Sequence, residues 1–188
     1  ITQPQEPTGA NGTARAYITS SRSGVFKIKV SVNGVNIDGE ALARFVCGPF
    51  TASASQYYLH QPPAKVLANN SDYYTVKIEA RDANNNPIPG VSPSRLAVNN
   101  DDPANVSITY PADDSDTYGV MLFKVKASKQ GVKSLQAYID GERIKTNDRK
   151  DSLELAFVTN PVDADKSYAE VDGASFAPAD GNSEIRFK

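Results

Sequence analysis

The chain repeats its own pattern after about 110 residues. Residues 12–37 align without a gap on residues 119–144, so that Gly12 meets Gly119 and Gly24 meets Gly131. The matching glycines mark tight turns, where the backbone needs a positive φ. A period of about 110 residues is the size of one β-sandwich, so we expect successive copies of such a unit. Further matches follow along the chain: Asn33-Gly34 with Asp140-Gly141 and, after a short insertion near residues 145–150, Arg44-Phe45-Val46 with Ala156-Phe157-Val158.

Between the turns, apolar and polar residues alternate with a period of two. The clearest runs are residues 25–32, 73–80, 120–127 and 152–158. Such alternation indicates strands with one buried face, which is typical of antiparallel sheets. We therefore predict an all-β fold, a sandwich of about seven or more strands. The predicted core consists of Val76, Ile78, Leu122, Val125, Leu135, Ile139, Leu155 and Phe157.

The repeat register also predicts how the chain is divided. Residues 1–47 correspond to the C-terminal strands of one unit, residues 48–158 to a complete unit, and residues 159–188 to the N-terminal strands of a further unit. The linkers, residues 47–50 and 159–162, are short and contain proline, so we expect them to be stiff. In the last part, Ile185 and Phe187 are expected to face a core.

Several motifs resemble those of a known family. Asp82–Val91 reads DANNNPIPGV and is similar to the DANGNPVPGV hallmark of bacterial immunoglobulin-like domains of the intimin/invasin type. Residues 68–78 and 179–187 resemble the second strand of that family, and residues 118–132 and 11–25 resemble its later glycine-containing segment. The chain departs from the family pattern where Pro93 and Arg95 follow the motif, because the family usually places an apolar strand there.

The resemblance implies immunoglobulin-like β-sandwich repeats in tandem. It further implies a non-enzymatic stalk or spacer segment of a bacterial cell-surface adhesin, which presents a binding tip for cell adhesion. The expected partners are neighbouring immunoglobulin-like units of the same chain, and a host-cell or matrix receptor through a region outside this sequence. The expected location is the bacterial cell surface, with outer-membrane anchoring through another region. From the residues alone, Asp82–Val91 is interpreted as a corner: Asp82 ends a strand, an Asn enters the left-handed region, and the prolines stiffen the exit.

The composition excludes several chemistries. One Cys and one His cannot form an internal disulfide or a structural zinc site. His60 has no acidic neighbour in sequence, and Cys47 has no basic setting, so we interpret them as structural residues and expect no enzyme activity, catalytic site or cofactor. The net charge of −2 argues against nucleic-acid binding. No apolar run approaches the roughly 20 residues that span a bilayer, so we expect no membrane insertion by this segment.

The carboxylates of residues 101–116 suggest one candidate ligand. Calcium prefers oxygen ligands from converging loops, but the spacing here matches no regular calcium-binding loop. We favour a solvated acidic loop and predict no metal site, with calcium as the alternative. Tyr57-Tyr58 and Tyr73-Tyr74 are each expected to place one ring in the core and one outside.

Two alternative functions remain open from the sequence. The first is a self-assembling extracellular filament subunit that exchanges β-strands, because half-units leave open strand edges. The second is an accessory binding module of a secreted enzyme, although the chain has no Trp to supply a carbohydrate platform. An adjoining catalytic domain in the full reading frame would support the second alternative.

Overall fold

A computed structural model describes residues 1–63, 65–159, 169–173 and 184–186. The chain separates into two compact units, Ile1–Val158 and Thr159–Lys188. In the second unit Ile185 is 39% exposed, and Phe187 lies outside the described residues. The expectation that these two residues face a core therefore stays a prediction. None of the described segments forms a helix with the length and hydrophobicity that crossing a bilayer requires.

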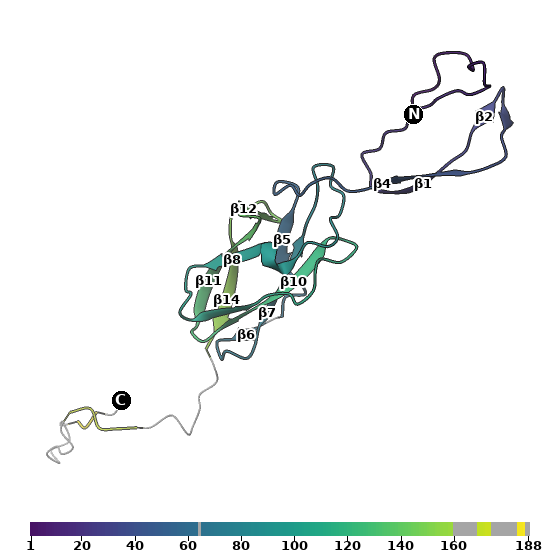
Figure 1. Cartoon of the computed structure of the whole chain (residues 1–188). Helices are drawn as coiled ribbons and strands as arrows, with labels where there is room; N and C mark the ends of the chain where they lie inside the picture. The colour runs from purple at the N-terminus through teal and green to yellow at the C-terminus, as the bar shows by residue number, and fades with distance from the viewer. Residues whose placement is uncertain (64, 160–168, 174–183, 187–188) are drawn as a thin grey trace. The chain divides into compact units, whose positions relative to one another are not determined.

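The regular elements of residues 48–158, called the central sandwich below, are strands apart from one 3₁₀ turn (Figure 1). Its elements are β5 (Gln56–Leu59), β6 (Val66–Leu67), β7 (Tyr74–Glu79), the 3₁₀ turn η1 (Pro93–Arg95), β8 (Leu96–Asn100), β9 (Val106–Thr109), β10 (Val120–Ala127), β11 (Gly131–Ile139), β12 (Glu142–Arg143), β13 (Lys145–Thr146) and β14 (Leu153–Val158). The two residues that depart from the family pattern, Pro93 and Arg95, form η1, which precedes β8.

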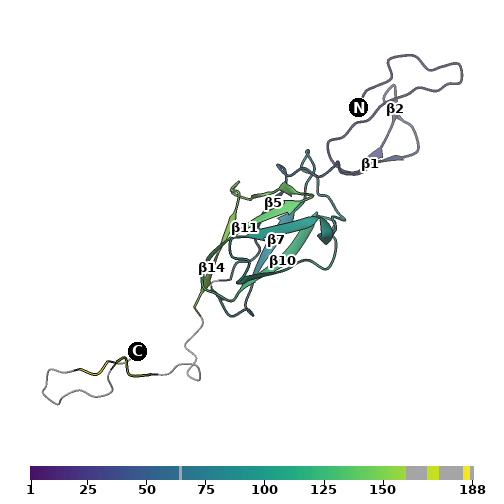
Figure 2. The same cartoon turned by 60° about the vertical axis from the view of Figure 1, so that its left-hand side comes forward.

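Two five-strand sheets make up the central sandwich. The first has the order β13-β5-β7-β10-β9, and the second joins β12, β11, β14 and β6, with β8 paired to β11. Neighbouring strands are antiparallel except for β13 with β5 and β14 with β6, which are parallel. After the 60° turn of Figure 2, β7 and β10 lie side by side, as their register requires. The predicted all-β sandwich is confirmed.

The core lies between the two sheets, as the alternation requires. Seven of the eight predicted core residues are buried, and Leu122 is the exception with 42% exposure. The prediction for Leu122 is wrong because β10 turns its odd-numbered residues inward. Met121 and Phe123 are 3% and 1% exposed, whereas Leu122 pairs with Lys77 on the outer side of the sheet.

Two tyrosines fill the core and keep their hydroxyl groups bonded. The Tyr57 hydroxyl donates to the carbonyl of Leu135 at 2.9 Å, and burial raises the pKa of Tyr57 to about 12. The Tyr74 hydroxyl donates to the carbonyl of Ala156 at 2.7 Å, and its ring packs edge-on against Phe157 with centroids 5.1 Å apart. Hydrogen-bonded tyrosines avoid the cost of burying an unpaired hydroxyl, which stabilises the core.

Residues 1–47, called the leading segment below, repeat part of the second sheet of the central sandwich, the strands β11, β12 and β14. The segment contains β1 (Gly24–Ile28), β2 (Ser31–Val32), β3 (Val35–Asn36) and β4 (Ala41–Phe45). Gly24 pairs with Phe45, as the repeat-equivalent Gly131 pairs with Phe157. The turn residues match as well, because Asn33 has a φ of 52° and Asp140 a φ of 53°. The repeat in the sequence is therefore also present in the backbone.

The leading segment leaves apolar side chains exposed. Val25, Val35 and Leu42 are 61%, 70% and 67% exposed. Residues 13–20, which correspond to β10, make an isolated bridge between Tyr17 and Thr2 in place of a continuous strand. Two paired strands without a facing sheet bury little apolar surface, which accounts for this exposure.

Candidate functional site

The motif Asp82–Val91 begins where β7 ends and forms a compact corner. The amide of Asn85 donates to the carbonyl of Asp82 at 2.9 Å, and Asn85 has a φ of 65°. Asn tolerates this left-handed conformation better than most residues, so the predicted role of an Asn in the turn is confirmed. Backbone bonds from Asp82 to the carbonyl of Asn86 at 3.0 Å and a bridge from Arg81 to Pro87 close the corner.

The Asp82 carboxylate is the centre of this corner and is only 2% exposed. Its oxygens accept hydrogen bonds from the backbone amides of Asn84 and Asn86, both at 2.9 Å, and from the side-chain amide of Asn86, also at 2.9 Å. It also accepts a bond from the amide of Gly48 in the linker at 2.7 Å. Burial opposes ionisation, but these hydrogen bonds outweigh it and lower the pKa of Asp82 below its ordinary value.

Asn86 connects the corner to the leading segment. Its side-chain oxygen accepts a bond from the amide of Ser23, and its side-chain nitrogen donates to the carbonyl of Ser21, both at 2.9 Å. These partners are more than 60 residues away in the sequence, and they precede β1. We call Asp82 and Asn86, with the backbone groups of Ser21, Ser23 and Gly48, the junction clamp.

The linker between the two parts is held by further contacts. The amide of Thr51 donates to the carbonyl of Arg81 at 2.9 Å, and Phe50 forms a bridge with Asp82. Cys47 and Phe50 are partly buried against the core of the central sandwich. These contacts attach the first linker to the central sandwich, and its expected stiffness stays a prediction. They also make Cys47 a packing residue, as interpreted from the sequence.

A groove of about 410 Å³ runs along this junction. Phe45 and Val46 contribute to one side, and Pro87 and Pro89 of the motif contribute to the other. The prolines of the motif therefore face the end of the leading segment, in addition to stiffening the exit of the corner.

Gly119 packs closely against the backbone on either side of the corner, at Ala80 and Ile88. Its φ is +71°, and a Cβ at this position would lie 2.5 Å from the carbonyl oxygen of Ala80 and 2.9 Å from the amide of Ile88. The carbonyl of Gly119 accepts a bond from the amide of Ala80 at 2.8 Å. Both the positive φ and the close approach require glycine here, which explains its place in the repeat.

The acidic residues between 101 and 116 do not converge. Asp102 contacts Lys133 at 2.6 Å near the end of β10, and this contact lowers the pKa of Asp102. Asp116 lies before the start of β10, where it accepts bonds from the amides of Tyr118 and Val120. The eight residues of β10 separate the two ends by about 26 Å. Within the described ranges, no three His, Cys, Asp or Glu side chains form a group that could hold a metal ion.

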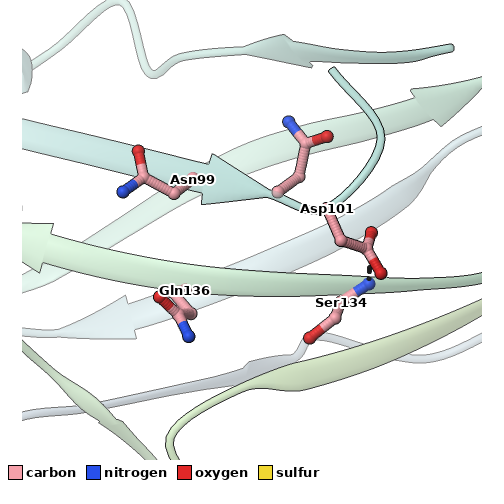
Figure 3. Close-up of a pocket in the computed structure, with 5 residues that line it drawn as sticks. Asn99, Asp101, Ser134 and Gln136 are labelled. Atoms are coloured by element: carbon pink, nitrogen blue, oxygen red, sulfur yellow. Dashed lines mark hydrogen bonds between the residues drawn. The ribbon is translucent and has the colours of Figure 1, made fainter. Parts of the chain in front are cut away.

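A small polar pocket lies between β8 and β11. Its volume is about 180 Å³, and it is lined by Asn99, Asn100, Asp101, Ser134 and Gln136. Figure 3 shows Asn99 on one strand facing the neighbouring strand that carries Ser134 and Gln136. The Asp101 carboxylate accepts a bond from the Ser134 amide at 3.0 Å, which joins the end of β8 to β11.

His60 and the tyrosine pairs lie in or next to β5 and β7. His60 follows β5, and its amide donates to the carbonyl of Thr75 at 2.8 Å. Among the described residues, the His60 ring has no hydrogen bond or ion pair. Tyr57 and Tyr74 are buried, whereas Tyr58 and Tyr73 face outward, which confirms the expected division of each pair.

Solved structures of bacterial proteins share the fold of this chain. FdeC, an adhesin of Escherichia coli, matches with a TM-score of 0.58 and 16% identity over 80% of this chain and 45% of its own. Invasin, a bacterial integrin-binding protein, matches with a TM-score of 0.53 and 22% identity over 87% of this chain and 31% of its own. InvD of Yersinia pseudotuberculosis matches with a TM-score of 0.56 and 20% identity over 80% of this chain and 42% of its own.

The central sandwich has the immunoglobulin-like fold of invasin-type adhesin domains. This confirms the fold that the resemblance implied. No protein-family model matches the chain. The chain spans less than half the length of each of these three structures.

Sequence reasoning missed one role within this immunoglobulin-like unit. The motif was interpreted as a corner alone, but Asn86 and Asp82 also contact the leading segment and the linker. The only sequence signal was the presence of two polar side chains with capacity for more hydrogen bonds than a turn requires. Their partners are backbone groups, which leave no signature in the sequence.

Proposed function

We propose that the chain is a non-enzymatic spacer segment of a bacterial cell-surface adhesin. In this proposal it connects an outer-membrane anchor to a receptor-binding tip, both in other regions of the protein. The immunoglobulin-like fold shared with FdeC, invasin and InvD supports the proposal, since FdeC is an adhesin and invasin is an integrin-binding protein. A spacer needs no catalytic group, and neither His60 nor Cys47 is required for this role.

The junction clamp is the observation that carries the proposal. A spacer transmits position and force only if successive parts cannot swing freely about their linkers. Asp82 and Asn86 are 2% and 9% exposed and bind three backbone groups outside the corner, at 2.7–2.9 Å. Buried, fully bonded polar groups of this kind hold one geometry, because any other arrangement leaves donors or acceptors unpaired.

The test is whether removing the clamp frees the junction. In Asn86→Ala, the bonds to Ser21 and Ser23 are lost, so we expect the leading segment to tumble more independently. Backbone ¹⁵N relaxation would show this as different correlation times for residues 24–45 and 56–158. Asn84→Ala is the matched control, because Asn84 uses only its backbone amide, which alanine retains. Equal correlation times in wild type and Asn86→Ala would contradict the spacer proposal.

A second candidate is a filament subunit that exchanges strands between chains. The exposed apolar residues Val25, Val35 and Leu42 on β1–β4 favour it, because an unpaired, apolar strand edge invites β-addition. Sedimentation velocity separates the two candidates. A filament subunit would show concentration-dependent growth that Leu42→Lys suppresses, whereas a spacer would remain at one sedimentation coefficient.

A further inference from the structure

The outer face of the sheet β5-β7-β10-β9 is positively charged. We call it the basic face and define it by Tyr58, Tyr73, Lys77, Glu79, Lys124 and Lys126. These side chains stand on the outward-facing positions of their strands, or next to them, while the intervening residues are buried. The register brings the cations near one another, because Leu122 pairs with Lys77 and Lys124 pairs with Thr75. Lys77 and Lys124 are thus diagonal neighbours about 7–8 Å apart, and Lys126 follows Lys124 after about 7 Å.

The positive charge on this face is only partly compensated. Glu79 is the carboxylate of the basic face, and it is already bound by Lys77 at 2.7 Å and by the Tyr58 hydroxyl at 2.7 Å. In the described part of the chain, no carboxylate lies within ion-pair distance of Lys124 or Lys126. The protein as a whole carries a net charge of −2, so the concentration of cations on this face is local.

The two outward tyrosines hold the lysines in place. The Lys77 ammonium lies 5.5 Å from the centre of the Tyr58 ring, and the Lys124 ammonium lies 4.3 Å from the centre of the Tyr73 ring. Cation–π contacts of this kind reduce the freedom of the lysine side chains. They also cover one side of each ring, so neither ring is fully available to stack on a nucleobase.

We propose that the basic face binds an acidic polysaccharide, a linear sugar polymer that carries sulfate or carboxylate groups. Lys124 and Lys126 supply point charges for successive anionic groups. The hydroxyl groups of Ser107, Thr75 and Thr109 stand opposite these lysines in the register, where they can bond to sugar hydroxyls. The choice of polysaccharide over nucleic acid rests on the extracellular setting of the proposed function. Binding of this ligand would be a second role, in addition to that of a spacer.

Binding to immobilised heparin, a sulfated polysaccharide, tests this proposal with the full chain. We expect wild type to be retained at low salt and released as salt rises, because binding expels counterions. Lys124→Gln with Lys126→Gln should weaken binding about tenfold, which corresponds to about 1.4 kcal/mol. The slope of log affinity against log salt should fall by about 1.4, if each lysine contributes as it does on a flexible polyanion.

The matched control is Lys65→Gln with Lys129→Gln. It changes the net charge by the same amount at exposed positions outside the strands that carry the basic face. We expect it to elute with wild type. Equal elution of the two double variants would overturn the proposal. Competition by duplex DNA as effective as competition by soluble heparin would overturn the polysaccharide assignment. A melting curve of each variant verifies the fold. Heparin binding and junction relaxation are separate readouts, so either proposal can fail while the other holds.

Discussion

Replacing Asp82 with asparagine tests whether the junction clamp stabilises the central sandwich. The substitution keeps the shape of the side chain but exchanges one acceptor oxygen for an amide donor. In one orientation the new amide donor faces the N–H groups of Gly48 and the Asn86 side chain. In the other orientation it faces the backbone N–H groups of Asn84 and Asn86. At least one backbone donor and the new amide are then left unpaired in a site that is 2% exposed.

The expected cost follows from those unpaired groups. Each buried donor without a partner costs about 1–3 kcal/mol, so Asp82→Asn should destabilise the fold by about 2–5 kcal/mol. For a unit of this size the melting temperature should fall by roughly 8–20 °C. Differential scanning calorimetry at neutral pH measures the change, with Asp113→Asn as the control for the loss of one exposed charge. If the two variants melt within about 2 °C of each other, the reasoning from buried hydrogen bonds is wrong.

The pH dependence provides an independent reading of the same site. The folded state lowers the pKa of Asp82 from its ordinary value of 3.8, so its contribution to stability is present above that value. It is lost as the pH falls below 3.8 through the folded pKa, because protonation removes acceptors from the clamp. The difference in unfolding free energy between wild type and Asp82→Asn should therefore shrink below about pH 4. A difference that stays constant from pH 7 to pH 2.5 would contradict this assignment.

Three further predictions use the same unfolding measurements. Gly119→Ala should lower the free energy of unfolding by about 2 kcal/mol or more, because the new Cβ would press on the backbone of Ala80 at a positive φ. Gly141→Ala is the control, since the site has open space, and it should cost about 1 kcal/mol. Equal costs in urea titrations would contradict the close-approach argument. In wild type, burial raises the pKa of Glu79, but the bonds from Lys77 and Tyr58 outweigh burial and lower this pKa to about 2. Glu79→Gln should therefore flatten the pH dependence of stability between pH 4.5 and about 2. An unchanged profile would show that these bonds contribute little. Phe123→Ala should lower the free energy of unfolding by about 3–5 kcal/mol because Phe123 is buried, and Leu122→Ser should lower it by less than about 1 kcal/mol because Leu122 faces outward. The reverse order would show that Leu122, and not Phe123, faces the core.

The sequence predicted the fold well because its signals are local and repeated. The glycines of the repeat lie at positive φ, and the alternation in β7, β11 and β14 identifies the buried face. The error at Leu122 has a physical origin, since the run Val120–Phe123 is apolar on both faces. The even-numbered Lys124 and Lys126 on the same strand already indicated that Leu122 faces outward, because a strand alternates strictly.

The junction clamp and the basic face were beyond the reach of sequence reasoning for different reasons. Asn86 finds Ser21 and Ser23 only after both parts have folded, and its bonds are to main-chain atoms. Lys77, Lys124 and Tyr73 belong to separate strands, and only the strand order places them on one surface. Properties that depend on which strands are neighbours require the sheet topology, which periodicity alone does not provide.

The hydrogen bonds of the junction clamp do not involve the side chains of the leading segment. Ser21 and Ser23 offer only a carbonyl and an amide group to Asn86, and every residue except proline carries both. A different leading segment with the same backbone path would form the same hydrogen bonds to Asn86. Substitutions other than proline at residues 21 and 23 therefore need no compensating change at Asn86.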